Sequence, residues 1–177
     1  DELSICIALS PLWSVDLRSE WLGRLIATDA SDVFGFGVSS TSCPPELARH
    51  VGAQCSRRGD HVRFAQETED DPEKPRLGTE FRLPFGMSRF KTLATKKAQH
   101  ADHSVGLEAT ALGLGLDLLS RDRSTHGTRI AVLVDAQAVL YAAGKGRSSA
   151  PTLRQPFRRI AALSLTCGWL PHFAYAP

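Results

Sequence analysis

The spacing of apolar residues predicts a long helix in the second half of the chain. One set recurs every three or four positions over about 105–120: Leu107, Ala111, Leu114 and Leu118. This interval places the set on one face of a helix, and Ser104 is a natural N-cap for it. Gly113 and Gly115 lie inside the pattern, and each weakens the helix by roughly 1 kcal/mol relative to alanine.

A second helix is predicted for 152–166. Pro151 and Pro156 lie at its start, where proline is tolerated, and Gly168 follows its end, where glycine commonly stops a helix. The pattern of residues 169–177 then predicts a final strand.

Apolar runs closer to the N-terminus predict further strands. Residues 24–38 contain the first strand signal, an apolar run over 25–27 that the polar Thr28 and Asp29 follow, and a second strand is predicted near 36–40. A third strand is predicted for 61–66. Residues 130–134 form a continuous apolar run rich in β-branched residues, which is typical of a strand buried on both faces.

Three remaining segments complete the expected organisation. Residues 3–13 predict a short helix or an entry segment, 45–57 a short helix, and the charged residues 67–80 an exposed loop. The main elements therefore follow the order strand, strand, strand, helix, strand, helix, strand. This order predicts an α/β fold with a mixed sheet flanked by helices. We expect a lead-in segment over 1–20 and one domain over 21–177.

Composition changes this picture through the distribution of charge. The 21 basic and 19 acidic residues give a net charge of +2, which alone predicts no nucleic-acid partner. No acidic residue follows Asp135, however, and this part of the chain contains five basic residues: Lys145, Arg147, Arg154, Arg158 and Arg159. The four cysteines lack metal-binding spacing, and no apolar stretch reaches the ~20 residues that a membrane span needs.

Three acidic residues are candidates for chemistry, and each has a structural alternative. Asp135 closes the buried strand, but it could instead cap a following helix. Asp29 could be a turn residue beside Ser31 and Asp32. Glu108 could be a first-turn acid that the helix dipole stabilises. The residues taken singly leave these alternatives open.

Taken together, three ordered blocks around these acids resemble the ribonuclease H-like domain of retroelement reverse-transcriptase polyproteins. The blocks are TDASDVFGFG at 28–37, HSVGLEATALGLGL at 103–116 and VLVDAQAVLYAAGKGRSS at 132–149. In that family the first block reads TDAS before a Gly-rich run, a Leu-Glu pair opens a helix in the second, and an apolar strand ends in Asp before a Lys-Gly-Arg-Ser loop in the third. The resemblance extends from about Leu12 to the end of the sequence and implies a ribonuclease H-like fold.

The resemblance also implies a two-metal nuclease site. Asp29, Glu108 and Asp135 would be its catalytic and metal-binding residues, holding two Mg²⁺ or Mn²⁺ ions about 4 Å apart. The substrate would be the RNA strand of an RNA–DNA hybrid. His103 would order the entry of the helix or shuttle protons. Four basic residues would contact phosphates or, alternatively, form a solvated helix face: Lys145, Arg147, Arg154 and Arg158.

The sequence departs from the family pattern at one point. The fourth carboxylate of the family follows the last strand in a segment that usually reads Asn-Pro-Ala-Asp, whereas this sequence ends at Pro177 before that segment. We therefore expect a C-terminally truncated or domesticated domain that is degenerate and non-catalytic, and that serves as a structural or interaction subunit of a protein or ribonucleoprotein assembly. The alternative is an active Mg²⁺-dependent ribonuclease H whose fourth carboxylate lies beyond residue 177.

Overall fold

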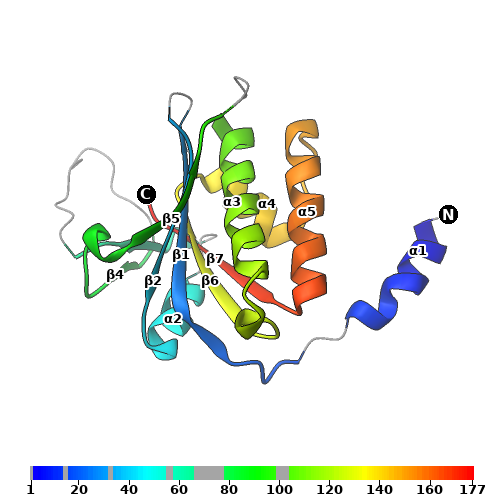
Figure 1. Ribbon diagram of the computed structural model, residues 1–177, viewed down its shortest axis with the longest axis horizontal. Helices are drawn as coiled ribbons and strands as arrows, with labels where there is room; N and C mark the ends of the chain where they lie inside the picture. The colour runs from blue at the N-terminus through cyan, green and yellow to red at the C-terminus, as the bar shows by residue number, and fades with distance from the viewer. Residues whose placement is uncertain (1, 14–15, 32–33, 55–57, 66–77, 99–103) are drawn as a thin grey trace.

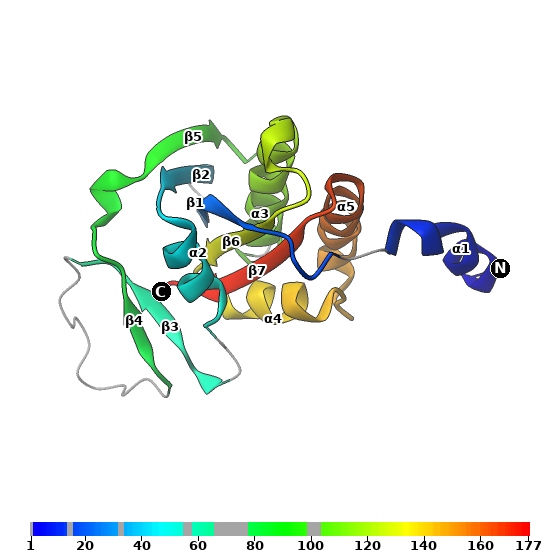
Figure 2. The same cartoon turned by 90° about the horizontal axis from the view of Figure 1, so that it is seen from below.

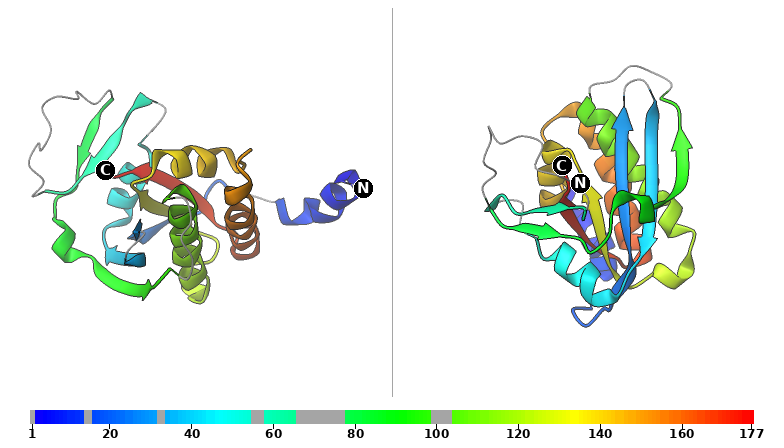
Figure 3. Two further views of the ribbon diagram at one scale, coloured as in Figure 1. Left: turned by 90° about the horizontal axis from the view of Figure 1, so that it is seen from above. Right: turned by 90° about the vertical axis from the view of Figure 1, so that its left-hand side faces the viewer.

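A five-stranded mixed sheet forms the centre of the protein. Three strands are antiparallel neighbours, and two more extend the sheet in parallel from the first of them (Figure 3). The sheet order is β5 (Lys91–Lys96), β2 (Gly35–Ser42), β1 (Trp21–Ser31), β6 (Arg129–Val134) and β7 (Leu170–Tyr175). The computed structural model describes residues 2–13, 16–31, 34–54, 58–65, 78–98 and 104–177.

Helices cover one face of this sheet, and a smaller layer covers the other (Figures 1 and 2). The first face carries α3 (Ser104–Ser120), α4 (Gln137–Lys145) and α5 (Pro151–Cys167). The second face carries α2 (Pro45–Gly52) and a two-stranded sheet of β3 (His61–Arg63) and β4 (Glu80–Arg82).

Alternation along the strands explains these two layers. In β1, Ile26 packs with the helices while Leu25 packs with α2 and β3. In β6, Val132 and Leu133 divide between the same two clusters, and residues 130–134 are all buried. Successive side chains of a strand point to opposite faces of its sheet, so a continuous apolar run supplies both cores. The α/β fold predicted from the sequence, a mixed sheet flanked by helices, is confirmed.

The N-terminal segment consists of α1 (Glu2–Leu9) and a short 3-10 helix, Ser10–Trp13. The 3-10 helix lies beside α5, whereas Figures 1 and 2 both show α1 away from the sheet. The short helix predicted within 3–13 is thus present. Its Leu3, Ile5 and Ile7 side chains are exposed. None of the helices in the described part of the chain could span a membrane.

Three sequence predictions, about a strand, a helix and a loop, need correction or fall outside the described residues. The third strand of the main sheet is β5, whereas residues 61–63 pair with β4 in the smaller sheet. β5 is an edge strand with mostly exposed side chains, so it carries no apolar run to reveal it. The helix predicted for 45–57 ends at Gly52, and most of the loop predicted for 67–80 lies outside the described residues.

The buried face of the long helix α3 is shifted from the one that the sequence predicts. Leu107 and Ala111 are buried as expected, but Leu114 and Leu118 are only partly buried. Gly115 faces β1, where a Cβ atom would lie 2.9 Å from Cγ2 of Thr28. The missing side chain therefore lets the helix approach the strand closely. Ser104 is the first residue of α3 rather than its N-cap.

The second predicted helix is confirmed as α5, with one more residue at each end than expected. Pro151 lies in its first turn, and Gly168 ends it in the left-handed conformation with φ of 64°. A hydrogen bond of 2.6 Å from Arg159 to Asp117 joins α5 to α3. This ion pair, together with the buried Phe157 and Ile160, holds α5 on the helical face of the sheet.

Candidate metal centre

Two of the candidate acids come from adjacent parallel strands. Thr28 of β1 is in register with Val134 of β6. The next residues along the two strands, Asp29 and Asp135, therefore lie beside each other at the same end of the sheet. Both side chains are exposed.

The third acid reaches the same point from the helical layer. Glu108 of α3 accepts a hydrogen bond at Oε1 from the backbone N–H of Ala30, with a distance of 3.1 Å. Its side chain is buried, unlike those of Asp29 and Asp135. One carboxylate oxygen from each of the three residues lies within 4.8 Å of the other two. Three elements that are distant in sequence thus bring their carboxylates together.

Crowding and burial alter the titration of this cluster. Loss of hydration, followed by the nearby charge of Asp135, raises the pKa of Glu108 to about 8. Loss of hydration and the charge of Asp29 likewise raise the pKa of Asp135 above its ordinary value. Oε2 of Glu108 is buried and makes no hydrogen bond with the described residues. At neutral pH Glu108 therefore keeps its proton, and full ionisation of the three acids needs a compensating cation.

The structural alternatives for the three acids do not match their positions. The N-cap residue of α4 is Ala136, without a side-chain cap, so Asp135 does not cap that helix. Glu108 is the fifth residue of α3, beyond the first turn, where an acid gains most from the helix dipole. Asp29 lies inside β1, opposite Gly37 of β2, rather than in a turn.

A cavity of about 190 Å³ opens beside the two exposed acids. Asp29 and Asp135 line it together with Phe64 and Met87 from the second face of the sheet. The chain returns here after β7, since the N–H of Ala176 donates to the carbonyl oxygen of Val134. Among the described residues, the cluster contains three carboxylates, and the cavity gives a small ligand access to two of them.

The remaining candidate residues occupy other places. His103 lies outside the described residues. Lys145 and Arg147 line a second cavity beside α4, whereas Arg154 and Arg158 are exposed on α5 and do not line it. Neither the helix α4 nor this second cavity was predicted from the sequence. The signals that could have revealed the helix are Val139 and Leu140, which are buried on it.

Comparisons with known proteins add a likeness in fold. No family model matches the sequence, and no curated protein matches it. A solved structure of a ribonuclease H1, isolated from compost by a metagenomic approach, is similar with a TM-score of 0.45 and 15% sequence identity. The match covers 87% of this chain and 84% of that chain. At this level of similarity the comparison carries no argument about activity or substrate.

Proposed function

We propose that Asp29, Glu108 and Asp135 form a divalent-cation site through which the protein hydrolyses the RNA strand of RNA–DNA hybrids. The observation that carries this proposal is the convergence of the three carboxylates within 4.8 Å. The order of the three sequence blocks around them, which resembles that of retroelement ribonuclease H-like domains, supports the same chemistry.

The donor set fits Mg²⁺ or Mn²⁺. Both ions prefer hard oxygen ligands, and carboxylates are the usual protein ligands of Mg²⁺. The buried Oε2 of Glu108 has no hydrogen-bond partner among the described residues, so a cation would supply the missing interaction. A cation would also offset the repulsion between Asp29 and Asp135.

The residues around the three carboxylates would have separate roles. Bound cations in such a site polarise a phosphoryl oxygen and lower the pKa of water. Glu108 is held in place by the N–H of Ala30, and its burial keeps bulk water from one side of the cluster. Asp29 and Asp135 face the cavity, where they can meet ligands on the substrate side. The exposed Arg154 and Arg158 of α5 offer positive charge to the phosphates of a duplex.

A purely structural role explains the cluster less well. Holding three carboxylates together opposes folding, because burial and mutual repulsion disfavour their charged forms. A structural subunit would gain from replacing one acid with a neutral side chain. Three carboxylates nevertheless supply less negative charge than two divalent cations carry. We therefore expect the second cation to bind weakly and turnover to be low.

Metal binding is the first test. Calorimetric titration of Mg²⁺ or Mn²⁺ into the wild-type protein should show binding that Asp135→Asn removes. Glu46→Gln is the matched control, since Glu46 is an exposed acid on α2. Identical titrations for the wild type and Asp135→Asn would rule out the site.

Cleavage is the second test. A labelled RNA–DNA hybrid incubated with the protein and Mn²⁺ should be cut slowly, and Asp29→Asn should stop the reaction. Metal binding without any cleavage would contradict the nuclease and favour the non-catalytic domain that the sequence predicts.

A further inference from the structure

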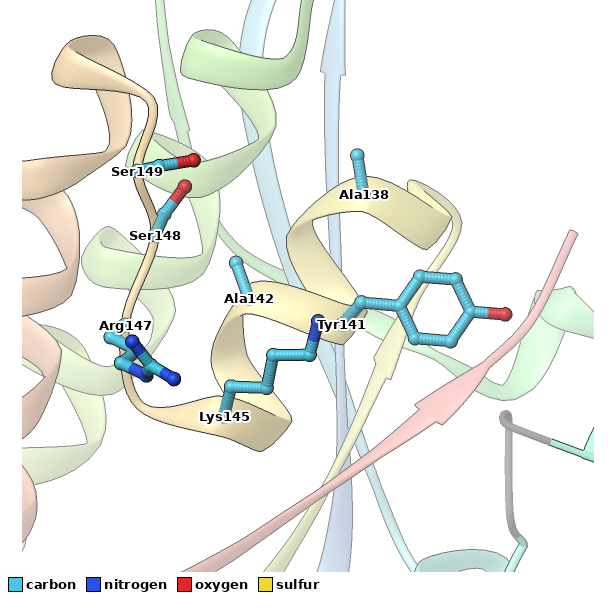
Figure 4. Close-up of a pocket in the computed structure, with 7 residues that line it drawn as sticks. All are labelled: Ala138, Tyr141, Ala142, Lys145, Arg147, Ser148 and Ser149. Carbon is cyan, nitrogen blue, oxygen red and sulfur yellow. The ribbon is translucent and has the colours of Figure 1, made fainter.

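A second cavity lies beside α4 (Figure 4). Its volume is about 410 Å³, and it is formed by the helix and the loop that leads to α5. The residues that line it are Ala138, Tyr141, Ala142, Lys145, Arg147, Ser148 and Ser149.

The end of α4 creates this cavity. Gly146 adopts the left-handed conformation with φ of 65°, which ends the helix and reverses the chain. The N–H of Arg147 then donates to the carbonyl oxygen of Ala142 at 3.2 Å, so the loop begins beside the last turn. Ala138 and Ala142 have small side chains and leave space along the helix. Figure 4 shows the Ser148 and Ser149 hydroxyls pointing from the loop toward the helix side of the cavity.

The lining favours an anion. Lys145 and Arg147 each bring a positive charge, and neither forms an ion pair with the described residues. No acidic residue follows Asp135 in the sequence to compensate them. The Ser148 hydroxyl oxygen accepts a hydrogen bond from the N–H of Ala150 at 3.1 Å, so its own hydrogen can be donated to a ligand.

The position of this cavity relative to the three carboxylates indicates which anion it binds. The nine residues of α4 separate Asp135 from this loop, and at 1.5 Å per residue they span about 13 Å, or about four base pairs along a duplex. Ala138, Tyr141 and Lys145 lie at helical spacing, so one face of α4 runs from beside Asp135 to the basic end. We propose that Lys145, Arg147 and the two serines bind a backbone phosphate of the nucleic acid whose cleaved bond lies at the carboxylates. This inference rests on the proposed function.

Binding without cleavage tests the cavity directly. In EDTA, fluorescence anisotropy should show the double variant Lys145→Ala/Arg147→Ala binding a labelled RNA–DNA hybrid about tenfold more weakly than the wild type. The slope of log affinity against log salt should fall in magnitude by between 1 and 2, because two phosphate contacts are lost. The control Arg123→Ala removes an exposed cation from the turn after α3. A loss as large in that control would overturn the proposal.

A second variant fills the cavity while keeping both cations. Ala138→Glu adds an acid at an exposed position of α4 and should weaken hybrid binding similarly. Ala161→Glu adds the same charge at an exposed position of α5 and should not. Unchanged hybrid binding in both cavity variants would overturn the phosphate site. Calorimetry with Mn²⁺ separates the two proposals. If these variants lose hybrid binding but the wild-type protein does not bind Mn²⁺, the phosphate site stands and the nuclease proposal fails.

Discussion

The acidic cluster and the basic cavity flank α4 and carry opposite charge, and they are built in different ways. Asp29, Glu108 and Asp135 come from β1, α3 and the end of β6, and Glu108 is buried. Lys145 and Arg147 lie two residues apart and are exposed. Asp135 just before α4 and Lys145 in its last turn both have the sign that the helix dipole favours. The acidic cluster thus depends on tertiary structure, whereas one turn of local chain produces the basic one.

Because the acidic cluster and the basic cavity are built differently, they should respond differently to substitution. Like charges brought together in a partly buried place oppose folding until a cation binds. Exposed like charges cost little, because water screens them. Changes at the acidic cluster should therefore raise stability and abolish activity, while changes at the basic cavity should alter binding alone.

The largest expected effect separates the two regions by function. Asp29→Asn should reduce cleavage of a hybrid by at least about a hundredfold, while hybrid binding in EDTA stays equal or becomes tighter. Lys145→Ala/Arg147→Ala should weaken that binding but keep the rise in melting temperature caused by Mn²⁺. Cleavage assays, anisotropy and thermal denaturation of both variants provide the measurements. If both variants lost the same property, the comparison between the two regions would fail.

The pH dependence of stability in EDTA should come next in size. The pKa of Glu108 is about 8 in the folded protein, against about 4.3 for an ordinary glutamate in the unfolded chain. Between these values the folded protein binds more protons, so wild-type stability should fall as pH rises from about 4 to 8. Glu108→Gln keeps an acceptor for the N–H of Ala30 and removes this pH-dependent loss of stability. The variant should therefore be more stable than the wild type at pH 9 by on the order of 2 kcal/mol.

Urea denaturation at pH 5, 7 and 9 measures this effect, with Glu46→Gln as the matched control. The exposed Glu46 should leave the pH dependence unchanged. If the free energies of unfolding of Glu108→Gln and the wild type changed with pH by the same amount, ionisation of the buried Glu108 would not oppose folding.

The approach of α3 to the acidic cluster offers a matched pair of glycine substitutions. Gly115→Ala should cost about 2 kcal/mol, because overpacking against Thr28 pushes the helix from β1. It should also weaken Mn²⁺ binding, since Glu108 would move with the helix. A Cβ atom at Gly113 meets nothing within 4 Å, so Gly113→Ala should stabilise the protein by up to about 1 kcal/mol. Equal effects of the two substitutions, measured by chemical denaturation, would contradict the close approach.

The smallest expected effect concerns the attachment of α5. The hydrogen bond from Arg159, followed by that from Arg121, lowers the pKa of Asp117. A lowered folded-state pKa stabilises the protein at neutral pH, and this contribution disappears as pH falls through that value. Asp117→Asn should therefore be less stable at pH 7 by under about 1 kcal/mol, with the difference vanishing below about pH 4. Thermal denaturation across this range would detect it, and a difference that grew in acid would contradict it.

Local patterns predicted most of the elements but not all of them. The apolar run over 130–134 and the helix ending before Gly168 are both present as expected. β5 was missed because an exposed edge strand needs no apolar pattern. α3 was placed correctly, but its buried face was only partly predicted, because Gly115 carries no hydrophobic signal and yet allows a close approach to β1.

The candidate site divides in the same way. By itself the sequence determined which residues are acidic, that Asp29 and Asp135 close apolar runs, and that the chain after Asp135 is basic. Only the tertiary structure decided that Thr28 pairs with Val134, that Glu108 is buried against Ala30, and that three carboxylate oxygens lie within 4.8 Å. The physical reason is that periodicity reports burial within one element. Distances between elements depend on strand register and on how closely a helix can approach a sheet.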